Sequence, residues 1–458
     1  MGAILFAVFA AMEILLTVLS CTKYRKLWHR NRVLFTGAEL ILLLSVILLP
    51  VTGQKWRFTG CAIILGIRLV VSGISYLIKR RGTAKEKTNA KVITGAIMSI
   101  FLIGFALFPA FIFTGYSGLK TSGQYKVKET QAILIDKSRL EAHENDGSNR
   151  EIPIHFYYPE SDAVNCPLVL FAHGSFGYYQ SNSSLYMELA SNGYVVASID
   201  HPYYAFFTKD TKGKIIIVDF EFVQTAVNMQ NSSDYTETEE DFNTICEWMS
   251  IHTADENFVL DSIKAAKNSG ALDEAWYTRS ENAKSEILKA LETADTEKIG
   301  LMGHSIGGAA AVQLGRERGD ITAVIDIDGT MLGEQISFND GKLDYNPDPY
   351  PIPILSLDNA RHWAESYVVD RETDYVNKYV LDNAVDGREA HFDGTEHMDF
   401  TDLPLFAPAL AKLLGKGDVD SSEFIPKINS IMLNYFNYYL KGEGEPNIGS
   451  WDAQAAVN

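Results

Sequence analysis

Cysteine is scarce in this chain: its 458 residues include four cysteines, and no two of them are separated by two residues. Zinc sites and thioredoxin-like redox sites use such C-x-x-C pairs, so the sequence indicates neither. We also expect no other metal and no organic cofactor. Cys21 and Cys61 lie in apolar segments. The remaining two, Cys166 and Cys246, predict either a disulfide in an oxidising compartment or two buried thiols.

Acidic residues are almost absent from the first quarter of the chain. Residues 1–116 contain 14 Lys and Arg against 3 Asp and Glu, a net charge of +11, whereas residues 117–458 contain 26 against 55, a net charge of −29. This split predicts a membrane-embedded part followed by a soluble, acidic part. Because nucleic-acid binding requires concentrated Lys and Arg, the composition argues against a nucleic-acid partner.

Four long apolar runs fill the basic part of the chain. They cover residues 3–20, 33–51, 58–78 and 92–116. Each is close to the ~20 residues that a helix needs to cross ~30 Å of hydrocarbon. The first run lacks a basic stretch ahead of it and a small-residue cleavage site after it, so we interpret it as a retained helix rather than a signal peptide. The sequence therefore predicts an integral, multi-pass membrane region over residues 1–116.

Positive charge is concentrated in two of the three connections between these runs. The second connection has only Lys55 and Arg57. The first and third connections hold the larger set: Lys23, Arg25, Lys26, Arg30, Arg32, Lys79, Arg80, Arg81, Lys85, Lys87 and Lys91. Basic connections stay in the cytoplasm. The pattern thus predicts that the N-terminus and the domain after the fourth run lie on the extracellular side of the cell membrane.

Three charged residues interrupt the apolar runs: Glu13, Glu39 and Arg68. At 1.5 Å of rise per residue, Glu13 and Arg68 both fall near the middle of a bilayer. A charge at that depth costs several kcal/mol unless it is paired or hydrated. We expect a structural Glu13–Arg68 ion pair between the first and third helices. A transport or lipid-headgroup site is the alternative.

The acidic part of the chain alternates short strands with helices. Alternation of apolar and polar residues over 131–138 and 150–158 predicts an antiparallel hairpin. Continuous apolar runs, separated by helical stretches, follow at 167–172, 194–200, 298–302, 321–327 and 352–357. Such runs predict a mostly parallel sheet that is covered by helices on both faces, and thus an α/β fold.

The expected domain boundaries follow from these patterns. We predict a linker over residues 117–130, the α/β domain over 131–445, and a C-terminal tail over 446–458. The segment 204–294 does not follow the strand–helix rhythm, and it begins with a possible hairpin at 208–219. An insertion of this length is typical of a cap over a binding site.

A serine lies within the sequence Gly303-His304-Ser305-Ile306-Gly307, which has the form G-x-S-x-G. An apolar strand precedes it and an alanine-rich helix follows it, which is the context of a nucleophile elbow. In such an elbow the serine occupies a strained turn, and the two glycines allow strand and helix to approach closely. Ser305 is therefore the candidate nucleophile.

A serine hydroxyl needs a base and a carboxylate to act as a nucleophile. The best candidate base is His397, in a loop after the strand predicted at 388–392. His391 lies within that strand, and His362 follows an earlier strand. Two carboxylates compete for the third role, because Asp328 and Asp358 each end a predicted strand. Asp326 shares a strand face with Asp328 and adds to the ambiguity.

An acyl-transfer site also needs hydrogen-bond donors for an oxyanion. The segment Ala172-His-Gly-Ser-Phe-Gly177 follows a buried strand and is the natural first strand–helix loop. The backbone N–H groups of Ser175 and Ile306 are the expected oxyanion donors. Nearby aromatic residues, among them Phe176 and Tyr178, predict either an apolar substrate pocket or packing of the core and cap.

These motifs resemble one family, the secreted, calcium-independent platelet-activating factor acetylhydrolases and their bacterial relatives, which are close to the dienelactone hydrolase-like group of α/β-hydrolases. The resemblance covers residues 131–406 and is carried by "REIPIHFYYP", "PLVLFAHGSFG", "NGYVVASIDHP", "HTADENFVLDSI", "EKIGLMGHSIGGAAAV", "AVIDIDG" and "GTEHMDFTDLP". It implies the α/β-hydrolase fold, with His397 as base and Asp328 as acid. In many other α/β-hydrolases the acid comes one strand later, which would select Asp358.

The expected function is that of a membrane-anchored serine hydrolase that cleaves carboxylic esters through a Ser-His-Asp triad. The resemblance implies short-acyl or oxidised phospholipids as substrates, and small soluble esters are also compatible with the motifs. A peptidase or thioesterase on the same fold is one alternative. A catalytically silent binding module at the cell surface is another. The sequence leaves the oligomeric state open.

Overall fold

The computed structural model of this chain describes residues 1–22, 24–49, 52–82, 87–161, 164–230, 236, 238–367, 375–446 and 448. Lys23 and Lys85 of the basic connections, and most of the predicted tail at 446–458, lie outside these ranges. The chain forms two compact units. Residues 1–118 and 403–414 make up the helical unit, and residues 119–402 and 415–458 make up the sheet unit.

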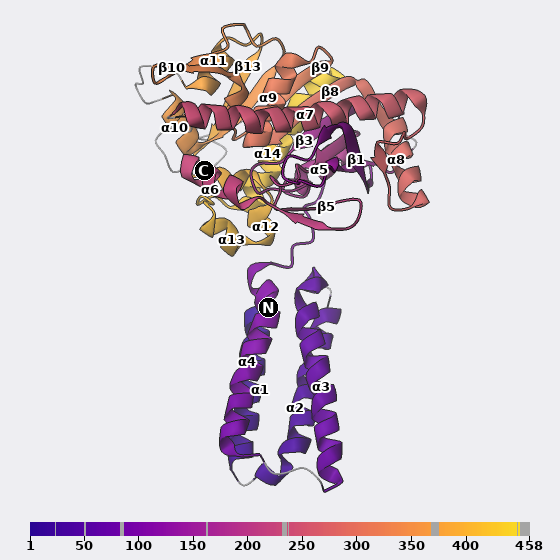
Figure 1. The fold of residues 1–458 in the computed structure, drawn as a ribbon, viewed down its shortest axis with the longest axis vertical. Helices are drawn as coiled ribbons and strands as arrows, with labels where there is room; N and C mark the ends of the chain where they lie inside the picture. Colours follow the sequence, from indigo (N-terminus) through magenta and orange to yellow (C-terminus); the bar gives the residue numbers. More distant parts are fainter. Residues whose placement is uncertain are drawn as a thin grey trace. The chain divides into compact units, whose positions relative to one another are not determined.

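The helical unit contains the four long apolar helices that the sequence predicts. They are α1 (Gly2–Cys21), α2 (Trp28–Leu48), α3 (Thr59–Arg80) and α4 (Asn89–Ile112), with short 3₁₀ helices η1 (Arg25–Leu27) and η3 (Lys55–Phe58) ahead of α2 and α3 (Figure 1). All four are long and apolar enough to cross a membrane. Large apolar side chains also cover their outer faces, as at Ile41, Phe101 and Phe105, which are each about two-thirds exposed or more. Such a surface suits hydrocarbon rather than water.

Three buried charged residues of the helical unit lie against one another. Arg68 on α3 donates a hydrogen bond to Glu13 on α1, as the predicted ion pair requires. Glu39 on α2 joins them, with an oxygen 3.6 Å from the Arg68 guanidinium. One cation between two carboxylates thus links three helices, and this pairing offsets part of the cost of placing charge in an apolar interior.

A short segment from late in the sequence also belongs to the helical unit. It contains α12 (Leu403–Phe406) and α13 (Pro408–Leu413). The Thr114 N–H donates to the Phe406 carbonyl (2.6 Å), and the Thr114 hydroxyl donates to the Leu405 carbonyl (2.8 Å). These residues lie within the range 131–445 that the sequence assigns to the α/β domain. Their backbone bonds group them with the end of α4 instead.

The sheet unit is built around nine strands in the order β13-β12-β9-β8-β3-β4-β2-β1-β7. The six parallel strands are β3 (Cys166–Ala172), β4 (Val195–Ile199), β8 (Ala294–His304), β9 (Ile321–Ile327), β12 (Ile354–Asn359) and β13 (Gly387–Phe392). The antiparallel part contains β1 (Val127–Leu140), β2 (Asn149–Pro159) and the two-residue β7 (Trp276–Tyr277).

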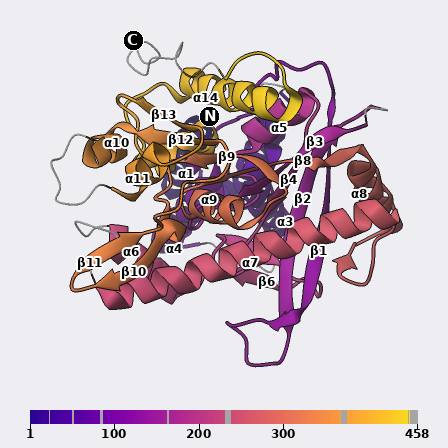
Figure 2. The same cartoon turned by 90° about the horizontal axis from the view of Figure 1, so that it is seen from above.

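Helices cover both faces of this sheet. Figure 2 shows α5 (Ser183–Ser191) and α14 (Ser421–Phe436) on one side of the strands, with α7 (Glu239–Ser269), α8 (Glu281–Thr293) and α9 (Ile306–Glu317) on the other. Every residue of β3 and β4 is buried, which explains why their sequences are almost entirely apolar. This arrangement is the α/β-hydrolase fold that the sequence predicts.

The segment 204–294 divides into two structural parts. The predicted hairpin is present as β5 (Phe207–Lys209) and β6 (Ile215–Ile217), and α6 (Phe220–Gln230) follows it. The second half of α7 and most of α8 belong to the domain itself, because Val259, Leu260 and Ile287 lie in the main core. In the described part of this segment, β5, β6 and α6 lie outside that core and form a candidate cap.

The predicted disulfide is not formed. Cys166 is buried at the start of β3, and Cys246 on α7 is exposed, and both are free thiols. Cys246 thus also differs from the alternative of two buried thiols. The strand places Cys166 in the protein interior, and the helix places Cys246 at the surface. The spacing of the two cysteines along the sequence does not reveal this difference.

Remaining elements of the sheet unit lie near its β13 end. They are η4 (Leu332–Glu334), β10 (Gln335–Asn339), β11 (Lys342–Tyr345), α10 (Ala360–Tyr367), α11 (Val376–Asp382) and η5 (His397–Phe400), with a π-helical turn, η6 (Asn437–Lys441), after α14.

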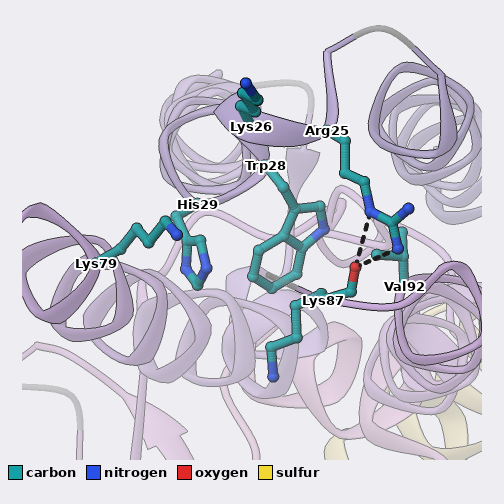
Figure 3. Close-up of a pocket in the computed structure, with 7 residues that line it drawn as sticks. All are labelled: Arg25, Lys26, Trp28, His29, Lys79, Lys87 and Val92. Carbon is teal, nitrogen blue, oxygen red and sulfur yellow. Dashed lines mark hydrogen bonds between the residues drawn. The ribbon is translucent and has the colours of Figure 1, made fainter. Parts of the chain in front are cut away.

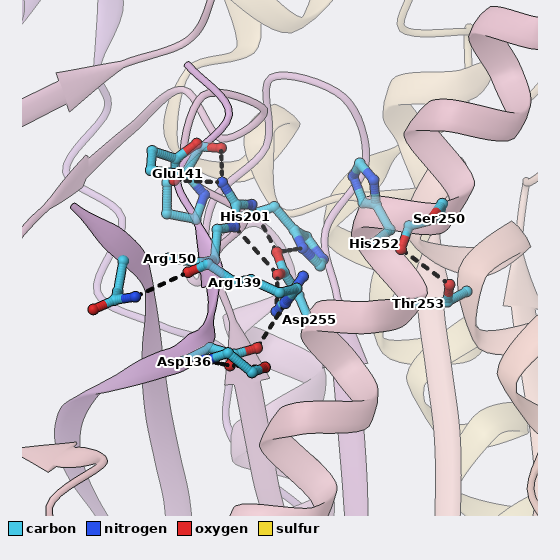
Figure 4. A network of polar contacts seen from close by, with 12 residues as sticks. Asp136, Arg139, Glu141, Arg150, His201, Ser250, His252, Thr253 and Asp255 are labelled. Carbon is cyan, nitrogen blue, oxygen red and sulfur yellow. Dashed lines mark hydrogen bonds and ion pairs between the residues drawn. The ribbon is translucent and has the colours of Figure 1, made fainter. Parts of the chain in front are cut away.

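A buried polar network joins the β1–β2 hairpin to α7 (Figure 4). Arg150 on β2 bonds both oxygens of Asp255 on α7, at 3.2 and 2.7 Å, and Glu141 at 2.9 Å. Arg150, Glu141 and Asp255 are all buried. Arg139 adds a second guanidinium, 2.8 Å from Asp255. The Arg150 guanidinium also donates to the Pro202 carbonyl (3.2 Å), which fixes the loop after β4.

We expect Arg150→Met to destabilise the sheet unit by about 3–5 kcal/mol, because it leaves the buried Asp255 and Glu141 carboxylates short of a cation. The measurement is urea-induced unfolding of the full chain in detergent, in a background with Cys21→Ser, Cys61→Ala and Cys246→Ser, followed by the reaction of the buried Cys166 with a thiol reagent. The matched control is Lys137→Met, which removes an exposed cation 2.8 Å from the exposed Glu274. This control should cost less than about 1 kcal/mol. Equal effects of the two substitutions would contradict the assigned role of Arg150.

Candidate active site

Ser305 occupies the sharp turn between β8 and α9. Its backbone has φ 56° and ψ −127°, a conformation that is strained for a residue with a side chain. A side chain at Gly303 would meet the Gly307 carbonyl at 2.2 Å, and one at Gly307 would meet the Ala172 carbonyl at 2.3 Å. Both glycines are therefore required by close backbone approach, as the G-x-S-x-G pattern predicts. The turn is fixed by the Ser305 N–H, which donates to the Ile327 carbonyl (2.9 Å).

His397 and Asp328 form a hydrogen-bonded pair beside this turn. The His397 Nδ1 lies 2.7 Å from an oxygen of Asp328, although the two residues are 69 positions apart. Asp328 follows β9 and has a positive φ of 54°. His397 opens η5, after β13. Because Asp328 engages Nδ1, the second ring nitrogen of His397 remains available to a serine hydroxyl.

Asp328 is fully buried and is held as a carboxylate. Asn359 donates its backbone N–H (2.7 Å) and its side-chain amide (2.9 and 2.8 Å) to the two oxygens of Asp328. Burial by itself raises the pKa of Asp328, but hydrogen bonds from His362 and His397 outweigh burial and hold that pKa well below its ordinary value. A permanently ionised acid suits the task of orienting a histidine and stabilising its charged form.

His304 links the serine turn to the His397 loop. Its ring centroid is 4.5 Å from that of His397, and its Nε2 lies 3.3 Å from the His397 carbonyl. Burial, with the nearby His397, lowers the pKa of His304 to about 3, so this ring is neutral. Since Ser305 is the next residue, this contact places the base loop beside the candidate nucleophile.

Asp358 pairs with a different histidine. One of its oxygens lies 3.2 Å from the Nδ1 of His362, and the other accepts a hydrogen bond from Ser356 (3.0 Å). His362 is also 3.6 Å from Asp328 and bonds the Tyr375 hydroxyl. The structure thus brings Asp328 to His397 and leaves Asp358 beside His362. Sequence reasoning left His362 as a less favoured candidate base and did not single out Asn359; the one signal for both is their place at or just after the end of β12, at the same sheet edge as Asp328.

Three ligand atoms of Asp328, Asp358 and His362 lie within 4.8 Å of one another, a spacing that would suit a cation. However, Asp328 already accepts hydrogen bonds from both Asn359 and His397. A metal would have to displace these donors, so we assign none to this cluster.

The loop after β3 passes directly over the serine. A side chain at Gly174 would meet the Cβ of Ser305 at 2.9 Å. The N–H groups of Phe176 and Gly177 already have acceptors, since Phe176 donates to the Tyr204 carbonyl (3.1 Å) and Gly177 to the Gly174 carbonyl (2.8 Å). Ser175 therefore supplies the candidate oxyanion donor of this loop. Ile306 is the first residue of α9, where N–H groups have no acceptor within the helix.

A histidine pair connects this loop to the Arg150–Asp255 network. The Nε2 of His173 accepts the His201 backbone N–H (3.2 Å), and the Nδ1 of His201 lies 3.0 Å from Asp255 (Figure 4). Burial lowers the pKa of both rings to about 4, so both are neutral. With Nε2 of His173 as acceptor, its Nδ1 carries the proton and donates to the Gly174 carbonyl (2.8 Å). The network thus holds the backbone of the candidate oxyanion loop.

The two predicted substrate-binding aromatics pack against the candidate cap. The Phe176 ring centroid lies 5.5 Å from that of Phe222 on α6, and the Tyr178 centroid lies 5.8 Å from that of Phe207 on β5. Both Phe176 and Tyr178 remain partly exposed. Their positions suit either packing or an apolar wall for a substrate.

The strand order and the serine elbow define an α/β-hydrolase. A family model described as platelet-activating factor acetylhydrolase, isoform II, matches residues 153–456, about two-thirds of the chain. The chain belongs to this family. The match begins on β2 and leaves the four apolar helices outside it.

Individual relatives are distant. A platelet-activating factor acetylhydrolase from Bos taurus is 24% identical over 301 residues, which cover 60% of this chain and 57% of the relative. A probable 1-alkyl-2-acetylglycerophosphocholine esterase from Arthroderma benhamiae is 23% identical over 293 residues, which cover 62% of this chain and 63% of the relative. The chain thus spans about three-fifths of the curated relatives it matches. A solved structure of a ferulic acid esterase from Streptomyces cinnamoneus has 18% identity and a TM-score of 0.49, covering 72% of this chain and 94% of that one.

Proposed function

We propose that this protein is a carboxylic ester hydrolase that acts through Ser305, His397 and Asp328. The observation that carries the proposal is the His397–Asp328 hydrogen bond of 2.7 Å beside the strained Ser305 turn. Membership of the acetylhydrolase family supports it. Two relatives whose names include acetylhydrolase or esterase support the same reaction class.

In the proposed mechanism, His397 takes the hydroxyl proton of Ser305 as the serine oxygen attacks the ester carbonyl. Asp328 stabilises the imidazolium that forms. The N–H groups of Ser175 and Ile306 donate to the oxyanion of the tetrahedral intermediate. His397 then gives its proton to the leaving alcohol, and a water molecule, activated in the same way, releases the acid and regenerates Ser305.

The proposed substrates are short-acyl or oxidised phospholipids. Family membership and the names of the relatives motivate this choice. Phe176 and Tyr178, packed against the aromatic residues of β5 and α6, would line the acyl side of the site. The four apolar helices would hold the enzyme at a membrane, where such lipids are found.

We further propose that these helices span the cell membrane with the sheet unit on the extracellular side. The basic first and third connections motivate this orientation. Both lie at the end of the helical unit that is opposite to the end of α4 from which the chain continues.

We expect Ser305→Ala to abolish fluorophosphonate labelling and to lower kcat for ester hydrolysis by at least about 10⁴-fold. The measurement uses the full chain in detergent with a panel of esters of increasing acyl length, together with thioester and peptide substrates. Ser269→Ala, which removes an exposed hydroxyl at the end of α7, is the matched control and should keep full activity. Folded protein that is neither labelled nor active would instead indicate a binding module.

The second prediction separates the two candidate acids. Asp328→Asn should lower kcat by about 10⁴-fold, because an amide cannot hold and stabilise the His397 imidazolium. Asp358→Asn should lower kcat by less than about tenfold, since Asp358 pairs with His362. Labelling by fluorophosphonate at high pH would show that both variants keep the serine turn. Loss of activity in Asp358→Asn alone would contradict the assignment.

The third prediction concerns orientation. Cys246 is exposed on α7, so a membrane-impermeant maleimide should label it in intact cells. Cys246→Ser should remove the label. Labelling that appears only after the cells are permeabilised would contradict an extracellular sheet unit.

A further inference from the structure

A small pocket lies where the α1–α2 and α3–α4 connections meet. Figure 3 shows the seven side chains that line it: Arg25, Lys26, Trp28, His29, Lys79, Lys87 and Val92. Four of these seven carry a positive charge, and among the described residues that line the pocket none is acidic. The proposed hydrolase site uses none of them.

Specific contacts hold these cations close together despite their mutual repulsion. The Arg25 guanidinium donates two hydrogen bonds to the Lys87 carbonyl, at 3.0 and 2.7 Å, and so joins the two connections. Trp28 is buried between cations, with the Lys87 Nζ 5.8 Å and the Arg32 Cζ 5.1 Å from its ring centroid. Like charges gathered in this way repel one another, and a bound anion would relieve that repulsion.

A buried histidine in the same pocket has an unused polar atom. His29 is 93% buried, and its Nδ1 lies 2.9 Å from the Ser75 hydroxyl. Its Nε2 is buried and has no hydrogen-bond partner among the residues that the structure describes. If Ser75 donates to Nδ1, the proton of the neutral ring sits on Nε2, which can then donate to an anionic oxygen. A buried polar atom without a partner is unfavourable, so the pocket favours a ligand that supplies one.

We propose that this pocket binds the phosphate of an anionic lipid headgroup. The pocket lies at the ends of helices that are long enough to span a membrane. In a membrane, the ends of such helices lie at the depth of the lipid headgroups. Cationic pockets between such helices on the cytoplasmic side suit anionic lipids, which are enriched in that leaflet. The proposal rests on the proposed membrane insertion and is independent of ester hydrolysis at Ser305. Its role would be to anchor and stabilise the helical unit.

The test measures lipid-dependent stability of the helical unit in the full chain. Cys61 is fully buried in the core of that unit. In a background with Cys21→Ser, Cys166→Ala and Cys246→Ser, the reaction of Cys61 with a thiol-sensitive dye on heating reports the opening of the helical unit. Dioleoylphosphatidylglycerol, dioleoylphosphatidylcholine and inorganic phosphate are each titrated into the detergent-solubilised protein. Ester hydrolysis is measured on the same samples, so that a failure of the lipid site is distinguished from a failure of the proposed activity.

Phosphatidylglycerol should raise the midpoint temperature in a saturable way, and phosphatidylcholine should not. Lys26→Gln with Lys87→Gln should weaken the apparent affinity for phosphatidylglycerol by about 30-fold, or about fivefold for each charge removed. Arg30→Gln with Arg81→Gln is the matched control. It removes the same charge from exposed residues that do not line the pocket, and it should change the affinity by less than about twofold.

Several outcomes would overturn the proposal. Equal midpoint shifts with phosphatidylglycerol and phosphatidylcholine would exclude an anionic headgroup, and equal losses in the two double variants would exclude a site at this pocket. A full shift with millimolar inorganic phosphate would identify a free anion as the ligand and would also overturn the lipid assignment. If the Lys26/Lys87 double variant has a lower midpoint temperature in the absence of lipid, the single variant Lys26→Gln, at an exposed position, is used instead. It should weaken the apparent affinity for phosphatidylglycerol by about fivefold.

Discussion

Asp328 lies fully buried at the carboxyl end of β9, and a buried carboxylate is stable only where other donors replace water. Asn359 from β12 and His397 from the loop after β13 supply these donors. The ends of three adjacent parallel strands are therefore fixed to one another through a single acid. The position of the candidate base relative to the serine turn depends in part on this arrangement, because His397 opens a short 3₁₀ helix outside the sheet.

The opposite side of the site is held in a comparable way. Gly174 has to pass close to Ser305, and its carbonyl is bonded by His173, which in turn accepts from the His201 backbone. Asp255 then connects His201 to the buried Arg150. Two buried ionic groups thus support the two loops of the candidate site. One supports the candidate acid and base, and the other supports the candidate oxyanion donor, which is how a site on loops can be kept rigid.

The surfaces of the two units differ in polarity. The helical unit exposes apolar side chains along its long helices and buries charged ones there, as Arg68 and Glu13 show. The sheet unit buries its apolar strands and carries a large excess of acidic residues. A cationic pocket lies at one end of the helical unit. Its positive charge is complementary to that of an anionic lipid headgroup. If the proposed membrane insertion and lipid site hold, the helical unit would both tether the esterase unit and recognise lipid.

Local patterns in the sequence determined the four apolar helices, the strands of the sheet and the serine turn. These features depend on the spacing of apolar residues and on glycines that only a tight turn requires, so they can be recognised without knowing the fold. Other features depend on residues far apart in the chain. The pairing of His397 with Asp328, the contact of Asp358 with His362, the grouping of residues 403–414 with the end of α4, and the free state of Cys166 and Cys246 were decided only by tertiary structure. The order of strands in the sheet and the packing of helix ends bring these groups together, and no local pattern encodes that order.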